Sequence, residues 1–127
     1  MIEEIEMRTT IINSLLMCVM LLSPMAASAH AILVKSQPAK DETVKEAPKR
    51  IDLWFNDPVR SEYKALAVID SENKRVDNRD VEQSLTDGSN IHATVGDLAP
   101  GTYTVRYRVV SEDTHIVTGK FQFTVKP

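Results

Sequence analysis

The chain has 127 residues, with 43% hydrophobic and 26% charged residues and a formal net charge of −3. This length suits a single domain, and the slight acidic excess argues against a nucleic-acid-binding protein, which would carry a basic patch or stripe. All five methionines and the single cysteine lie in the first 25 residues, which excludes disulfides, a cysteine nucleophile, cysteine-bound zinc and iron–sulfur clusters from the rest of the chain.

The first segment has the features of a cleavable signal peptide. Residues 11–22 form an apolar run that is too short to cross the hydrocarbon core of a membrane as a helix. A Ser-Pro pair ends this run, and the Ala-Ser-Ala at residues 27–29 presents small residues at the two positions that a signal peptidase reads. The sequence therefore predicts a signal peptide over residues 1–29 and an exported, soluble domain over residues 30–127 that is not inserted in the membrane. An uncleaved anchor or a leader without fixed structure is the alternative.

The domain after the leader reads as a series of short β-strands. Apolar residues recur with period two or in short runs at seven places, and no part sustains the 3.6-residue period of a helix. The runs are Ile32–Val34, Ile51–Phe55, Leu66–Ile69, Val81–Leu85, Ile91–Val95, Tyr103–Val109 and Phe121–Val125. Turn residues separate them at roughly 8–12-residue spacing, which predicts an all-β Greek-key sandwich of about seven strands.

The aromatic side chains of the domain are expected to form much of its core. Phe55, Phe121 and Phe123 occupy the alternating apolar positions of their runs. Trp54 has the opposite parity to Phe55, so either both faces of that strand are covered or Trp54 lies near a functional site. The charge-rich segment over residues 40–50 is expected to be a solvated loop.

Cleavage after residue 29 would make His30 the first residue, and an amino-terminal histidine supplies two nitrogen ligands to a metal ion. Its α-amine and its imidazole Nδ1 close a six-membered chelate ring with the ion. The reference pKa values of these groups are roughly 7.8 and 6.5, so they release their protons to a metal at little cost near neutral pH. Such a nitrogen pair suits Cu(II), which prefers tetragonal nitrogen and oxygen coordination and heads the divalent affinity series.

Asp113 and His115 are the best candidates for the remaining ligands. They lie two residues apart after the strongest predicted strand, and residues i and i+2 of an extended backbone project to the same face. A carboxylate and an imidazole would then meet one ion while Thr114 points away, which gives three nitrogens and one oxygen together with His30. An Asp-x-His triplet alone is a weak signal, and its combination with a histidine at the cleavage site is more specific. His92 has only an exposed strand face to recommend it and is assigned to the surface.

Seven stretches of the sequence carry a resemblance to a known family. They are His30–Leu33, Ser36–Ala39, Ala47–Pro48, Ile51–Val59, Leu98–Val105, Arg108–His115 and Gly119–Val125. In this order and spacing, the chain resembles the CopC/YobA periplasmic copper-binding proteins over essentially all of residues 30–127. The resemblance implies an immunoglobulin-like or cupredoxin-like fold that binds Cu(II) through His30, Asp113 and His115.

The chain departs from the family pattern at three points. Some members place a Glu near the copper, and the matching Asp57 has a shorter side chain, which favours a role outside direct ligation. Family members commonly have Gly where Thr114 stands, which predicts a stiffer loop. Some members also bind Cu(I) through methionine thioethers, the soft ligands that this oxidation state prefers. No methionine or cysteine follows residue 29, so the chain resembles the members that bind Cu(II) alone.

The resemblance implies a non-enzymatic copper carrier or buffer in copper resistance or homeostasis. We expect a periplasmic monomer whose partner is an inner-membrane copper transporter of the CopD type. Two other functions stay open: a redox enzyme with a histidine-brace copper centre, and a metal-free module that only binds partners. Oxidised glycan products would favour the enzyme, whereas a melting temperature that copper does not raise would favour the metal-free module.

Overall fold

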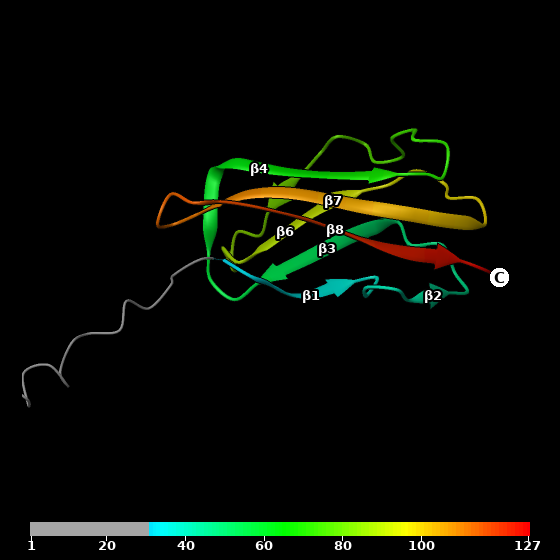
Figure 1. Ribbon diagram of the computed structural model, residues 1–127, viewed down its shortest axis with the longest axis horizontal. Helices are drawn as coiled ribbons and strands as arrows, with labels where there is room; N and C mark the ends of the chain where they lie inside the picture. Colours follow the sequence, from blue (N-terminus) through cyan, green and yellow to red (C-terminus); the bar gives the residue numbers. More distant parts are fainter. Residues whose placement is uncertain (1–30) are drawn as a thin grey trace, which may run out of the picture.

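The alternating residues form two packed β-sheets in the computed structural model (Figure 1). The structure describes residues 31–127, so the predicted signal peptide and His30 lie outside the described residues. No helix in the described part is long and apolar enough to span a membrane. The first sheet has the order β1 (Leu33–Gln37), β3 (Arg50–Phe55), β6 (Asn90–Thr94), β5 (Glu82–Gln83). The second has the order β2 (Thr43–Val44), β8 (Ile116–Val125), β7 (Gly101–Ser111), β4 (Val59–Ile69).

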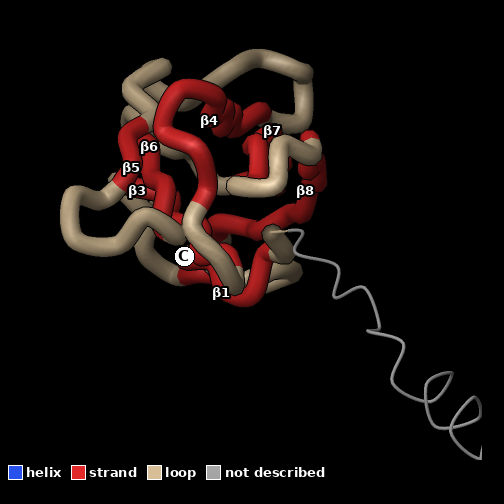
Figure 2. The backbone as a smooth tube through the Cα atoms, turned by 90° about the vertical axis from the view of Figure 1, so that its left-hand side faces the viewer, coloured by secondary structure: helices blue, strands red, loops and turns tan. Residues whose placement is uncertain are grey.

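The strand order is that of an immunoglobulin-like sandwich, whose two layers are seen end-on in Figure 2. The first sheet matches strands A, B, E and D of that fold, and β4, β7 and β8 match strands C, F and G. The Tyr103 hydroxyl near the start of β7 donates to the Ala99 carbonyl at 2.5 Å, which is the tyrosine corner of immunoglobulin-like domains. The prediction of an all-β sandwich is confirmed. The additional strand is β2, which has only two residues and lies in the segment that was expected to be a loop.

The core lies between the two sheets. Phe55, Phe121 and Phe123 are each at most 5% exposed, as their positions in the alternating runs predicted. Phe55 of β3 meets Tyr107 of β7 edge to face, with ring centroids 5.5 Å apart, and this contact joins the two sheets. Burying each large apolar side chain stabilises the fold by about 1.5–3 kcal/mol.

The outer face of β3 is covered as well. Trp54 is half-buried there, and the Lys35 ammonium of the neighbouring β1 lies 4.7 Å from the centre of its ring. Asp52 on the same face is buried and accepts two hydrogen bonds from the Arg50 guanidinium, at 2.7 and 2.9 Å. The parity of Trp54 is therefore explained by cover on both faces of β3.

A buried carboxylate fixes the connection between β4 and β5. Asp77 has a fully buried side chain that accepts two hydrogen bonds from Arg75 and one from the Val68 N–H. Burial alone would raise the pKa of Asp77, but the hydrogen bonds from Arg75 and from the backbone outweigh it and lower that pKa below its usual value. Backbone bridges link Arg75 to Ile69 and Asp77 to Val95, so this loop ties one sheet to the other.

Candidate metal centre

Asp113 and His115 lie in the turn that joins β7 to β8. Two backbone hydrogen bonds close this turn, from the Ser111 N–H to the His115 carbonyl and from the Thr114 N–H to the Ser111 carbonyl, both at 2.9 Å. Thr114 has a φ of 74°, in the left-handed region, so the chain reverses between the two candidate ligands. The predicted extended backbone is wrong at this point. The turn nevertheless brings the two side chains together.

The carboxylate and the imidazole are in direct contact. His115 Nδ1 is 3.0 Å from Asp113 Oδ2. The hydroxyl of the fully buried Ser111 donates to the other carboxylate oxygen, Oδ1. This hydrogen bond is the main reason why the pKa of Asp113 is lowered to about 2, and the His115 ring and N–H lower it further against a partial opposing effect of burial. Asp113 is therefore ionised throughout the neutral range.

The spacing of these two groups fits two ligands of one metal ion. Nitrogen and oxygen donors lie roughly 2.0–2.2 Å from a small divalent ion, and two such donors at a right angle are about 2.9 Å apart. The 3.0 Å between Nδ1 and Oδ2 agrees with that separation, as it also agrees with a hydrogen bond. The side chains of Asp113 and His115 are 28% and 62% exposed, so an ion can reach them from solvent.

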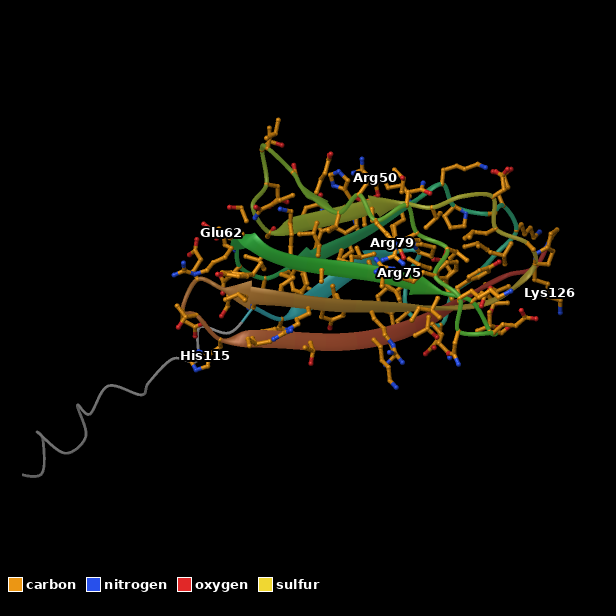
Figure 3. All side chains as sticks on the ribbon, turned by 90° about the horizontal axis from the view of Figure 1, so that it is seen from above. Arg50, Glu62, Arg75, Arg79, His115 and Lys126 are labelled. Atoms are coloured by element: carbon orange, nitrogen blue, oxygen red, sulfur yellow. The ribbon has the colours of Figure 1, made fainter. Side chains whose placement is uncertain are left out.

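The described chain begins beside this turn. Ala31, the residue after His30, is only 1% exposed. The Ile32 N–H donates to Asn56 Oδ1 at 2.7 Å, and the Asn56 N–H donates to the Ile32 carbonyl at 2.9 Å. Figures 1 and 3 show that the start of the described chain and the turn that carries His115 lie at the same end of the sandwich. Because His30 lies outside the described residues, its role as a ligand stays a prediction.

The other sequence candidates do not form a cluster of metal ligands with this pair in the described residues. Asp57 is exposed on the connection between β3 and β4. His92 belongs to β6 of the first sheet, where its side chain is only 16% exposed and its Nε2 is 3.7 Å from Glu82. Within the described residues, no group of three His, Cys, Asp or Glu side chains is arranged to hold a metal ion. The described part of the site is therefore the Asp113–His115 pair.

Two residues that support the site were not identified from the sequence. Ser111 could have been found, because it has the same parity as Asp113 and His115 at the end of the strongest predicted strand. Asn56 left no local signal, because its partner Ile32 is 24 residues away in the chain.

Comparisons with known proteins give one consistent family. The family described as the CopC domain matches residues 33–126. Protein YobA of Escherichia coli K12 is 32% identical over 99 residues, which cover 77% of this chain and 80% of YobA. The crystal structure of CopC from Methylosinus trichosporium OB3b has a TM-score of 0.72 at 34% identity and covers 77% of this chain and 95% of that one. PcoC, a methionine-rich copper resistance protein from Escherichia coli, has a TM-score of 0.67 at 30% identity, covering 77% and 100%.

Proposed function

The chain belongs to the CopC family, and from this premise we propose that it is a periplasmic protein that binds Cu(II) and carries or buffers it. The observation that carries the proposal is the contact between the Asp113 carboxylate and the His115 imidazole. This contact lies at the end of the sandwich where the described chain begins (Figure 3). Copper is the cargo of the protein, and its binding requires no catalysis.

The proposed ligand set combines His30 with the β7–β8 turn. His30 contributes its α-amine and Nδ1, and the turn contributes the His115 imidazole and the Asp113 carboxylate. Asn56 supports this arrangement because it holds Ile32, two residues after His30. Ser111 supports it because its hydroxyl orients the Asp113 carboxylate. Ligands that are held in place before the ion arrives lose less conformational freedom on binding, which raises affinity.

The proposed oxidation state follows from the donor atoms. Residues 26–127 contain no methionine and no cysteine, so nitrogen and oxygen are the side-chain donors available there. These donors suit Cu(II), whereas Cu(I) prefers thiolate and thioether sulfur. PcoC, by contrast, is described as rich in methionine.

The position of the site favours a carrier. His115 is 62% exposed on a turn at the tip of the sandwich, where a partner can approach the ion directly. We assign the protein to copper resistance or homeostasis, acting as a monomer that exchanges copper with an inner-membrane transporter of the CopD type.

Titration of the mature protein with Cu(II) against a competing chelator tests the proposed site. A variant with one extra residue before His30 and the variant His115→Ala should each bind Cu(II) at least about 100-fold more weakly, because removing a ligand costs more than removing a group that orients one. His92→Ala is the matched control and should retain the full affinity. Unchanged affinity in the first two variants would refute the site.

A further inference from the structure

A groove lined by arginines runs along the outer face of the second sheet. Arg106 and Arg108 are exposed on the outer face of β7. Their partners on β4 are Ala67 and Ala65, whose small side chains leave a hollow between β7 and the loop that carries Arg79. Figure 3 shows Arg79 beside the middle of β4. We call these five residues the arginine groove.

The positive charge of the arginine groove is not balanced by neighbouring acids. Arg79, Arg106 and Arg108 form no salt bridge with any residue in the described range 31–127. Lys120 of β8 lies directly opposite Arg106, and like charges in this position destabilise a sheet. Acidic and basic side chains nearly balance over residues 30–127 as a whole, so composition does not account for this concentration of charge. An anionic partner would relieve the repulsion.

The arginine groove continues toward the candidate metal centre. A second hollow of about 680 Å³ shares Ala65 and Arg108 with it and is lined further along by Tyr63, Thr114 and Ile116. Tyr63 and Ile116 are 66% and 58% exposed, so this part presents two large apolar side chains beside the cations Arg60 and Lys64. Thr114 separates the two candidate ligands in the sequence, so the second hollow ends at the metal-binding turn.

We propose that this continuous groove docks an extended, acidic segment of a partner protein. Guanidinium groups bind carboxylates through paired hydrogen bonds, and the arginine groove presents three of them. An apolar side chain of the segment lies between Tyr63 and Ile116, since large contacts of this kind carry much of the energy of interfaces. The single carboxylate that lines either hollow in the described chain is Glu62, which lies near the His115 end of β4 in Figure 3.

The shape of the groove favours a polypeptide over a membrane surface. The small side chains of Ala65 and Ala67 lie beside the much longer arginine side chains, so a single extended chain can enter between the guanidinium groups, whereas a planar layer of lipid headgroups would touch only their tips. The consequence for copper rests on the proposed function: a partner docked here reaches the metal centre and is thus a donor or acceptor of the ion.

Binding of a defined probe to the metal-free mature protein tests the docking site. The probe is a fluorescent ten-residue peptide of Asp and Glu that ends in Leu, and the readout is its anisotropy. The double variant Arg106→Glu/Arg108→Glu should weaken binding roughly tenfold or more, since it reverses the complementary charge. The matched control Lys40→Glu/Lys45→Glu changes charge by the same amount outside the groove and should stay within about twofold of the unchanged protein.

Two further measurements separate the groove from charge alone and from copper binding. Ala65→Leu fills the floor without changing charge and should weaken peptide binding while the melting temperature is retained. Cu(II) affinity should be the same in the groove variants and in the unchanged protein. The peptide measurement therefore tests the docking site even if the copper titration refutes the proposed metal centre. Equal peptide binding by the groove and control variants would overturn the proposal. Binding to phosphatidylglycerol vesicles in the absence of peptide binding would also overturn it, in favour of a membrane surface.

Discussion

Single side chains prepare the candidate metal centre before an ion is present. Asn56 exchanges two hydrogen bonds with Ile32, and the Ser111 hydroxyl donates to the Asp113 carboxylate. Neither residue needs to touch the ion, because each acts on a proposed ligand or on the chain beside one. Hydrogen bonds of this kind orient ligands and tune their basicity, and their loss typically lowers metal affinity.

Asn56→Ala should weaken Cu(II) binding by about 10–100-fold, because the chain that follows His30 loses its anchor. Asn56→Asp keeps an acceptor for the Ile32 N–H and should recover most of the affinity. Competition with a chelator measures both variants, and Asn78→Ala, whose side chain bonds Thr94 at the end of β6, is the control. Equal affinity for Asn56→Ala and the unchanged protein would show that the anchor does not position the site.

Thr114→Gly should raise the free energy of unfolding by about 0.5–1 kcal/mol. A β-branched residue at φ 74° pays a conformational penalty of roughly 1–2 kcal/mol, which glycine would remove. The greater freedom of glycine in the unfolded chain offsets about half of this gain in stability. Thermal unfolding should show a rise of a few degrees. Thr118→Gly, within β8, is the control and should lower the melting temperature. A lower melting temperature for Thr114→Gly would show that the left-handed conformation of Thr114 does not destabilise the folded protein.

At the scale of strands, alternation located the strand centres better than their ends. β7 was predicted over Tyr103–Val109, and the observed strand, Gly101–Ser111, is only slightly longer at each end. β4 begins at Val59, well before the predicted run at Leu66. The prediction missed this first part because a register shift between Val59 and Lys64 interrupts the alternation. β8 begins at Ile116 and includes Gly119, which adds no apolar side chain to the pattern because the Tyr107 ring fills its place.

The candidate site was predictable to the same extent. The spacing of Asp113 and His115 is local, so the sequence predicted that the two side chains meet although it predicted the wrong backbone, and their role as metal ligands stays a prediction. The contact of Asn56 with Ile32 depends on the pairing of β1 with β3, and no local pattern reports that register. The same reason hid the arginine groove, because Arg79 and Arg106 come together only through the folding of a loop against β4.

Asp77→Asn should destabilise the protein by about 2–4 kcal/mol at neutral pH, because it leaves Arg75 without its carboxylate in a buried contact. The pKa of Asp77 is lowered in the folded state, so its stabilising effect is present above the unfolded pKa near 3.9 and is lost as the pH falls further. The difference in stability between the two proteins should therefore shrink below about pH 4.

Urea unfolding at pH 7 and at pH 3 measures this difference. Asp97→Asn removes a solvent-exposed ion pair with Lys49 and should cost less than about 1 kcal/mol, which makes it the matched control. The same difference at both pH values would mean that the charge of Asp77 does not stabilise the loop.

At the scale of the whole molecule, the sandwich holds the start of the described chain and the β7–β8 turn at one end (Figure 1). The arginine groove lies on the outer face of the sheet that carries this turn. Metal binding and partner docking would therefore use adjacent surfaces of the same sandwich.

Cu(II) at about 100 times its Kd should stabilise the folded protein by about 2.7 kcal/mol, because it binds the native state alone. For a domain of this size the melting temperature should rise by roughly 10–20 °C. Addition of a chelator should reverse the rise, and His115→Ala should abolish it. A melting temperature that copper leaves unchanged would favour a metal-free interaction module.

The location of bound copper in crystals of the secreted chain tests the proposed centre most directly. With one equivalent of Cu(II), anomalous diffraction at the copper edge should give a single peak within about 2.2 Å of a His115 ring nitrogen and an Asp113 oxygen. The electron-density map of the same crystals should show His30 as the first residue, with its α-amine bound to the ion. A peak at His92, or a chain that begins at Ala31 with no copper beside Asp113, would contradict the proposed centre.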